Sequence, residues 1–360
     1  MVRKVKGLDP KLSSMETIAK AFLKVRSGRE SHPEILEMEK DLVSVFKGVQ
    51  YDIIHHTYKP GPYVEYDKIE RGKPRHVSFQ SMRDQMFQWV WKITVEPEIN
   101  KRLISQTYAS IKGRGQHDAV AKAKEYMERD REGTQYCFEF DVHHCFQSIT
   151  ADVVMRKFRR KFADKDVLWL TETILYGYHN GKELPLGNVT SHPLANYVLD
   201  DLDHVIKDGG TGMRAARYIR YLDNGYAWAR SKSYLRRVKK RVESKLAELG
   251  LMLKHTWQIY PVDSRGVPIL GFRVFHGFVL LSKKTKKRLK RFMGAAIEHM
   301  KGGEEPTETE IGQYNSYKGH LSHCNSWRLA KKTTRLFERL WRARTWMKSP
   351  QHRSVAPSSS

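Results

Sequence analysis

The spacing of apolar residues predicts helices along much of the chain. Residues 8–49 carry apolar positions at helical intervals in two runs, and we interpret them as two helices. Residues 81–95 predict an amphipathic helix with one apolar face, and residues 152–178 predict a helix pair. Further helices are expected in three later segments: 234–249, the basic stretch from Ser282 onward, and 329–347.

Other segments have the β-branched and aromatic content of strands. Residues 61–79 predict a hairpin with Gly72 in the turn, and residues 136–141 predict a strand that ends on Asp141. Residues 216–230 form two apolar arms around Asn224 and Gly225, a dipeptide typical of tight hairpin turns. This places Asp223 at a hairpin tip. Residues 257–260 and 269–275 are expected to form a pair of strands.

The composition is that of a soluble globular protein with a polyanionic partner. The 360 residues are 40% hydrophobic and 29% charged, enough to bury a large core. A net charge of +25 exceeds what solubility requires and favours nucleic acid as the partner. We find neither an apolar run of membrane-spanning length nor a signal peptide, so no membrane partner is expected. The three cysteines have no metal-binding spacing, which favours a reducing compartment.

Asp141 and Asp223 are the leading candidates for chemistry. Each carboxylate is expected at the end of a strand, and two such groups brought together can hold two Mg²⁺ ions for phosphoryl transfer. Asp223 taken alone is better explained as a turn residue, since Asp favours turns, and it is Asp141 upstream that favours the catalytic interpretation.

Three further segments have features suited to binding phosphate. Lys73 and Arg75 lie beside the first predicted turn, where they either clamp a triphosphate or form a solvated charged face. Residues 181–203 form a Gly/Pro loop that leads into a helix, whose free amides favour an anionic ligand. Seven of the nine residues from 283 to 291 are basic, as expected for a helix along a phosphate backbone.

The order of these segments resembles the reverse transcriptases over roughly residues 40–345. The shared pieces are a basic finger hairpin, an acid-ended strand, a Gly-loop helix, a Tyr-x-Asp hairpin, a Leu-Gly-Phe strand and a helical thumb. Residues 184–191 (Leu-Pro-Leu-Gly-Asn-Val-Thr-Ser) and 113–120 (Gly-Arg-Gly-Gln-His-Asp-Ala-Val) are most similar to the prokaryotic enzymes of diversity-generating retroelements.

The resemblance implies an α+β right-hand polymerase fold with fingers, a palm of antiparallel sheet plus helices, and a helical thumb. The implied regions are an N-terminal helical extension, fingers, palm, thumb and a disordered tail, at residues 1–50, 51–135, 136–280, 281–348 and 349–360. The implied cofactor is a pair of Mg²⁺ ions. The implied partners are an RNA template, a DNA or RNA primer, deoxynucleoside triphosphates and a small accessory protein, in the cytoplasm of a prokaryote.

The resemblance also assigns roles to individual residues. Asp141, Asp223 and the backbone carbonyl of Val142 would hold the metals, and Asn224 completes the catalytic motif. Phe146 matches the aromatic residue that excludes a 2'-hydroxyl. The remaining matches are nucleotide contacts at Lys73, Arg75, Leu186, Gly187 and Ser191, a primer grip at Leu270, Gly271 and Phe272, and thumb contacts to nucleic acid at Lys283, Lys284, Lys287, Arg288, Lys290 and Arg291.

Two residues depart from the family pattern. Asn224 stands where a second Asp is expected, and His192 stands where these enzymes usually have Gln.

The leading hypothesis is a reverse transcriptase of a retroelement that rewrites a target gene, with error-prone copying at template adenines. The alternatives are a reverse transcriptase of phage defence or abortive infection, and a catalytically weak nucleic-acid-binding scaffold.

Overall fold

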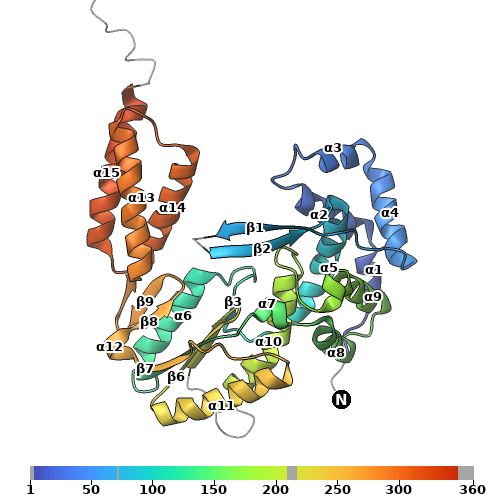
Figure 1. The fold of residues 1–360 in the computed structure, drawn as a ribbon, viewed down its shortest axis with the longest axis horizontal. Helices are drawn as coiled ribbons and strands as arrows, with labels where there is room; N and C mark the ends of the chain where they lie inside the picture. Colours follow the sequence, from blue (N-terminus) through green and yellow to red (C-terminus); the bar gives the residue numbers. More distant parts are fainter. Residues whose placement is uncertain (1–3, 71–72, 209–216, 348–360) are drawn as a thin grey trace, which may run out of the picture. The chain divides into compact units, whose positions relative to one another are not determined.

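The protein is described by a computed structural model covering residues 4–70, 73–208 and 217–347. The chain divides into two compact units. The first contains Met1–Gly115 and Phe138–Ile259, and the second contains Gln116–Cys137 and Tyr260–Ser360. Helices and strands alternate without regular repetition (Figure 1), which confirms the α+β class.

Four helices, instead of the two expected, form the N-terminal part of the first unit. Ser14 accepts a hydrogen bond from the Thr17 amide at the start of one helix, and Asp41 accepts one from the Ser44 amide at the start of another. Capping residues inside an apolar run satisfy backbone amides that a new helix leaves unpaired, so each run is split. The bounds are α1 Asp9–Leu12, α2 Met15–Arg26, α3 Pro33–Lys40 and α4 Leu42–Ile54.

The predicted finger hairpin is confirmed as β1 (Val64–Glu70) paired antiparallel with β2 (Lys73–Phe79). Gly72 lies outside the described residues. The next helix, α5 (Met82–Asn100), begins where expected, with Ser81 as its cap. The prediction of a single apolar face is wrong, because Phe87 and Trp91 are buried as well as Met82, Met86 and Val90. The other two residues expected on that face, Trp89 and Ile93, are only half-buried. This helix is therefore a central support of the first unit.

A five-stranded sheet carries both predicted acids. Its strand order is β3-β5-β6-β4-β7, with β5 and β6 antiparallel and β3 parallel to β5. Its central strands are buried through side chains such as Phe138, Phe140, Ile219 and Trp228. The bounds are β3 Thr107–Tyr108, β4 Tyr136–Asp141, β5 Arg217–Tyr221, β6 Asn224–Ala229 and β7 Gln258–Pro261.

Helices flank this sheet in the first unit. The expected helix pair is confirmed as α8 and α9, and the basic amphipathic helix is confirmed as α11. Helices α10 and α11 pack against each other, α10 against β5 and α11 against β6. The bounds are α7 Cys145–Ser148, α8 Ala151–Lys161, α9 Lys165–Tyr176, the 3₁₀ turn η1 His179–Gly181, α10 Ser191–Asp208 and α11 Lys232–Glu248.

The second unit contains a three-stranded sheet of order β10-β9-β8. The prediction that residues 269–275 form one strand paired with residues 257–260 is wrong. Leu270 and Gly271 both have positive φ and turn the chain between β8 and β9, which pair antiparallel with each other. The bounds in this part are α6 Gln116–Arg129, α12 Val262–Arg265, β8 Val267–Ile269, β9 Phe272–Phe275 and β10 Phe278–Leu281.

Three helices that pack on one another complete the second unit (Figure 1): α13 (Lys283–Lys301), α14 (Glu308–Ser322) and α15 (Trp327–Met347). Helices α13 and α15 match the predicted amphipathic stretches. Helix α14 was not predicted, because Tyr314 and Leu321 are its only buried residues and they give little periodic signal. The tail from 349 to 360 lies outside the described residues. Among the helices of the described chain, none has the length and apolar composition that crossing a bilayer requires.

Candidate active site

The two predicted acids lie at neighbouring strand ends in the first unit. Asp141 is the last residue of β4, and Asp223 lies in the turn between β5 and β6, the strand beside β4. The Val142 amide donates a 3.1 Å hydrogen bond to the Asp223 carbonyl, which ties the end of β4 to the turn. The sheet therefore brings together the two carboxylates that the sequence places 82 positions apart (223 minus 141).

The turn differs from the sequence prediction by two residues. Tyr221 pairs with Asn224, so Leu222 and Asp223 make the turn, and Asn224 and Gly225 belong to β6. Leu222, rather than Asn224, has the positive φ, at 52°. Gly225 has a packing role, because a Cβ there would lie 2.1 Å from the ring of Phe140. The glycine of the Asn-Gly pair is thus required by the close approach between β6 and β4, rather than by a turn.

The electrostatics of the pair suit a bound cation. Burial, and next the charge of Asp141, raise the pKa of Asp223. The Lys254 ammonium lies 3.1 Å from a carboxylate oxygen of Asp141, and the Lys254 amide also donates to the Asp141 carbonyl. In the described part of the chain, no group of three or more His, Cys, Asp or Glu side chains could surround a metal ion. Two carboxylates nonetheless fit Mg²⁺, which often takes one or two from the protein and its other ligands from phosphate and water.

Sequence reasoning missed Lys254. It follows an apolar run, Leu251 to Leu253, after α11, and nothing in that pattern distinguishes it from the other lysines of a basic chain. Its position became evident only from the pairing of this segment with the end of β4, where Val142 and Leu253 form an isolated bridge.

Asn224 interacts directly with one of the two acids. Its side-chain amide donates a 2.8 Å hydrogen bond to a carboxylate oxygen of Asp223. This donor favours the ionised form of Asp223 and opposes the upward shift of its pKa. The residue therefore lies at the acid pair and is more than part of a turn.

Phe146 lies in α7, which begins four residues after Asp141. Its ring contacts His192 of α10 edge-on, with ring centroids 5.2 Å apart, and the side chain is only partly buried. Burial, and next the charge of Lys92, lower the pKa of His192, so its ring is uncharged at neutral pH. Phe146, five residues after Asp141, is thus paired with an uncharged His192 ring.

We expect Phe146→Ala to raise the ratio of ribonucleotide to deoxynucleotide incorporation by roughly 10- to 100-fold, the range in which pocket shape discriminates a single hydroxyl. Removing the ring opens space without touching either carboxylate. The ratio is measured with matched nucleotide pairs on one primer and template. Phe146→Tyr, which keeps the ring, is the control, and an unchanged ratio in an active alanine variant would make Phe146 a packing residue.

The predicted nucleotide loop is attached to the finger hairpin. The Ser78 amide of β2 donates a 2.9 Å hydrogen bond to the Leu186 carbonyl. A Cβ at Gly187 would lie 2.1 Å from the Ser78 carbonyl oxygen, so the close approach requires glycine. Ser191 is buried, and its hydroxyl donates a 2.6 Å hydrogen bond to the Pro185 carbonyl, which fixes the loop from within. Leu186 is half-buried and Gly187 is exposed, so both are more accessible to a nucleotide than Ser191, the third predicted contact in this loop.

Lys73 and Arg75 are the predicted triphosphate contacts. Their backbones lie in β2, opposite Glu70 and Lys68, but their side chains are outside the described residues.

The second unit contains the predicted primer grip and the basic helix. Leu270 and Gly271 form the β8–β9 turn, the Gly271 carbonyl accepts from the Ser282 amide, and the Phe272 ring stacks on His320. The first turns of α13 bury Leu289 and Met293 and expose a basic surface. Of the predicted contacts, Lys283, Lys284, Lys287, Lys290 and Arg291 are exposed and Arg288 is half-buried, and Lys286 is exposed beside them.

A sheet with paired acids at adjacent strand ends, in a chain that also has a β-hairpin and a C-terminal group of helices, is typical of the right-hand class of polymerase. Residues 59–274 match the family described as reverse transcriptase (RNA-dependent DNA polymerase). The chain belongs to this family of enzymes, which copy a nucleic-acid template.

Two individual proteins are also similar. The "Putative COX1/OXI3 intron 1 protein" of Saccharomyces cerevisiae is 24% identical over 160 residues, which are 42% of this chain and 19% of that protein. The chain therefore spans about a fifth of the yeast protein's length. The structure of apo telomerase from Candida tropicalis, truncated from its C-terminal domain, aligns with a TM-score of 0.45 and 10% identity. That alignment covers 64% of this chain and 59% of the telomerase chain.

Proposed function

We propose that this protein is an RNA-directed DNA polymerase that makes cDNA from an RNA template with deoxynucleoside triphosphates. The observation that carries the proposal is the Asp141 and Asp223 pair, held at neighbouring strand ends, where burial and the charge of Asp141 raise the pKa of Asp223. Membership of the reverse transcriptase family supports the same reaction.

In this proposal the acid pair and the Val142 carbonyl hold two Mg²⁺ ions. When bound, the ions supply activation of the primer 3'-hydroxyl and neutralisation of triphosphate charge. The protein contributes position: Asp141 and Asp223 fix the reacting centre, and Phe146 lies against the sugar. The loop at Leu186, Gly187 and Ser191, with Lys73 and Arg75, receives the nucleotide.

We further propose the regional assignment of an N-terminal extension at 1–50, fingers at 51–135, palm at 136–280 and thumb at 281–348. The turn at Leu270 and Gly271 with Phe272 would be the primer grip. The exposed basic residues of α13 would follow the phosphate backbone, because an unrelieved cluster of that density repels itself.

From the loop sequence at 184–191 we propose that the protein is the reverse transcriptase of a diversity-generating retroelement, with a small accessory protein as a further partner. Flanking DNA that holds two near-identical repeats, one substituted mainly at adenines, would support a diversity-generating retroelement. Flanking defence genes without such repeats would support phage defence instead.

Primer extension by the purified protein tests the central proposal. The assay uses RNA and DNA templates, a DNA primer, deoxynucleotides and Mg²⁺, and we expect extension on RNA. Tight nucleic-acid binding without extension under any divalent metal would favour the scaffold function, for which Asn224 is the supporting observation.

We expect Asn224→Asp to lower the Mg²⁺ concentration for half-maximal extension by roughly 3- to 30-fold, the size of one added charge a few ångströms from a divalent ion. The new carboxylate would stand beside Asp223, whose oxygen the Asn224 amide now contacts. The measurement is extension rate against Mg²⁺ concentration. Asn180→Asp, at an exposed position of η1, adds the same charge elsewhere. Equal metal dependence in both variants would exclude residue 224 from the metal site.

A further inference from the structure

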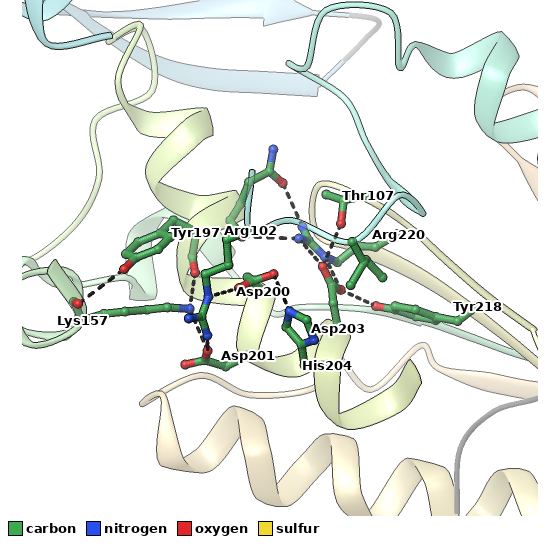
Figure 2. Close-up of polar contacts among 12 residues, drawn as sticks. Arg102, Thr107, Lys157, Tyr197, Asp200, Asp201, Asp203, His204, Tyr218 and Arg220 are labelled. Atoms are coloured by element: carbon green, nitrogen blue, oxygen red, sulfur yellow. Dashed lines mark hydrogen bonds and ion pairs between the residues drawn. The ribbon is translucent and has the colours of Figure 1, made fainter. Parts of the chain in front are cut away.

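A buried arginine lies next to the β5–β6 turn that contains Asp223. Arg220, on β5, is fully buried, with no exposed surface. Its Nε and one Nη each lie 2.7 Å from an oxygen of Asp203 on α10, a two-pronged ion pair (Figure 2). Asp203 also accepts hydrogen bonds from Tyr218 and Thr107, each at 2.9 Å. The carboxylate is thus satisfied on every side and fixes the guanidinium in one orientation.

The remaining guanidinium nitrogen reaches the turn. It donates a 2.8 Å hydrogen bond to the Leu222 carbonyl and a 2.9 Å hydrogen bond to the Asn196 side-chain oxygen. The Leu222 carbonyl belongs to the peptide plane that immediately precedes the Asp223 Cα. Leu222 also holds a positive φ, which a non-glycine residue keeps only when its surroundings enforce it.

The peptide plane after Asp223 is fixed independently. Its carbonyl accepts the 3.1 Å hydrogen bond from the Val142 amide. Both peptide planes that flank the Asp223 Cα are therefore pinned, one by Arg220 and one by the end of β4. Two pinned planes determine the direction of the Cα–Cβ bond and so the direction of the carboxylate.

We infer that Arg220 is a positioning residue that aims the Asp223 carboxylate at the metal site, with Asp203 as its anchor. The inference rests on the proposed polymerase activity, and it adds a residue that no sequence motif assigned. Arg220 does not touch the reacting atoms; it acts through the Leu222 carbonyl.

A second ion-pair cluster on the same helix provides a matched control. Arg102 lies 2.5 Å from Asp200 and 3.1 Å from Asp201, and Lys157 lies 2.9 Å from Asp201. Asp200 is fully buried, as Asp203 is. Figure 2 shows the two clusters side by side on α10. Within the described residues, no hydrogen bond or ion pair joins Arg102 to the β5–β6 turn.

The test compares Arg220→Lys with Arg102→Lys. A lysine can keep the charge opposite its aspartate, but one ammonium cannot reproduce the fork that spans Asp203, Asn196 and Leu222. For Arg220→Lys we expect kcat to fall roughly 10- to 100-fold, the loss that follows small misplacement of a catalytic group. The half-maximal Mg²⁺ concentration should rise roughly 2- to 10-fold, as for one lost hydrogen bond. The Kd for primer and template should not change.

Arg102→Lys should lower the melting temperature as well, though less, because the Arg102 side chain is 34% exposed and Arg220 is not exposed, and kcat and metal dependence should be unchanged. Equal losses of kcat in the two variants would overturn the inference and make Arg220 a stability residue. Mn²⁺ binding, followed by the EPR signal of the free ion, gives a readout that does not depend on activity. A wild type that binds Mn²⁺ without extending primers would reject the proposed function, while weaker Mn²⁺ binding by Arg220→Lys would still support Arg220 as a positioning residue.

A double variant covers the case in which Arg220→Lys fails to fold. Arg220→Gln with Asp203→Asn removes both charges together and leaves neither buried and unpaired. The shorter glutamine amide cannot span the distance from β5 to the Leu222 carbonyl while bonding residue 203. We expect this protein to fold, to bind Mn²⁺ more weakly and to lose kcat as Arg220→Lys does. Wild-type kcat and Mn²⁺ affinity in the folded double variant would overturn the inference.

Discussion

Asp141→Ala and Asp223→Ala should each lower primer extension by at least about 1,000-fold, because each removes a carboxylate worth several kcal/mol of metal-assisted transition-state stabilisation. RNA affinity should change by less than about 3-fold, since binding depends on basic surfaces that neither change touches. The measurements are single-turnover extension and equilibrium binding to the same primer and template.

Asp152→Ala is the control for these two variants. It removes an exposed carboxylate of α8 that hydrogen-bonds to Tyr176, away from the acid pair, and we expect near wild-type extension. If either active-site variant kept a tenth or more of wild-type activity, that aspartate would not be a metal ligand. A parallel loss of RNA binding would indicate misfolding, which a melting curve would detect.

Replacing Lys283, Lys287 and Lys290 together with glutamine should weaken nucleic-acid binding roughly 100- to 1,000-fold near 0.1 M salt. The slope of log affinity against log salt should flatten by up to about 3, because each lysine that neutralises a phosphate contributes about 0.9 to that slope. All three side chains are exposed on α13, while its buried face of Leu289 and Met293 stays intact. The folded structure should therefore survive.

The control removes the same charge from another surface. Lys11, Lys20 and Lys24 are exposed lysines of the N-terminal helical region, and their replacement by glutamine lowers the net charge equally. An unchanged slope in the α13 variant, or an equal change in both variants, would show that net charge, rather than contact by this helix, sets the affinity.

Most of the fold could be predicted because long periodic stretches leave few alternatives. Helices α8, α9, α11 and α13 were anticipated from apolar spacing, the hairpin at 61–79 and the strand that ends on Asp141 from strand-forming residues, and α10 from the Gly/Pro loop before it. The errors lie where a residue has two possible reasons to be present. Gly225 was interpreted as a turn residue, but β6 requires it because Phe140 packs against its Cα. Gly271 was placed within a strand, and it turns the chain.

The candidate site was predictable in its acids and not in its support. Asp141 and Asp223 each end an apolar run, so the residues immediately before them predict that they lie at strand ends. Arg220 and Lys254 are two of 65 basic residues, and sequence alone gives no sign that one is buried and the other contacts an acid. Their partners, Asp203 and Asp141, lie 17 and 113 positions away along the chain. Such contacts arise from tertiary packing and leave no periodicity.

The hydrogen bond from Ser78 to Leu186 couples two segments that are distant in the sequence. A rigid rotation of the β1–β2 hairpin must therefore move the 186–187 loop with it or break that bond. Gly187 has no side chain, so its backbone lies directly against the Ser78 carbonyl. In the proposed polymerase, capture of the triphosphate by the hairpin and seating of the nucleotide on the loop would then be one concerted movement. Its timing, rather than the affinity of either segment alone, would govern how long a mismatched nucleotide remains before chemistry.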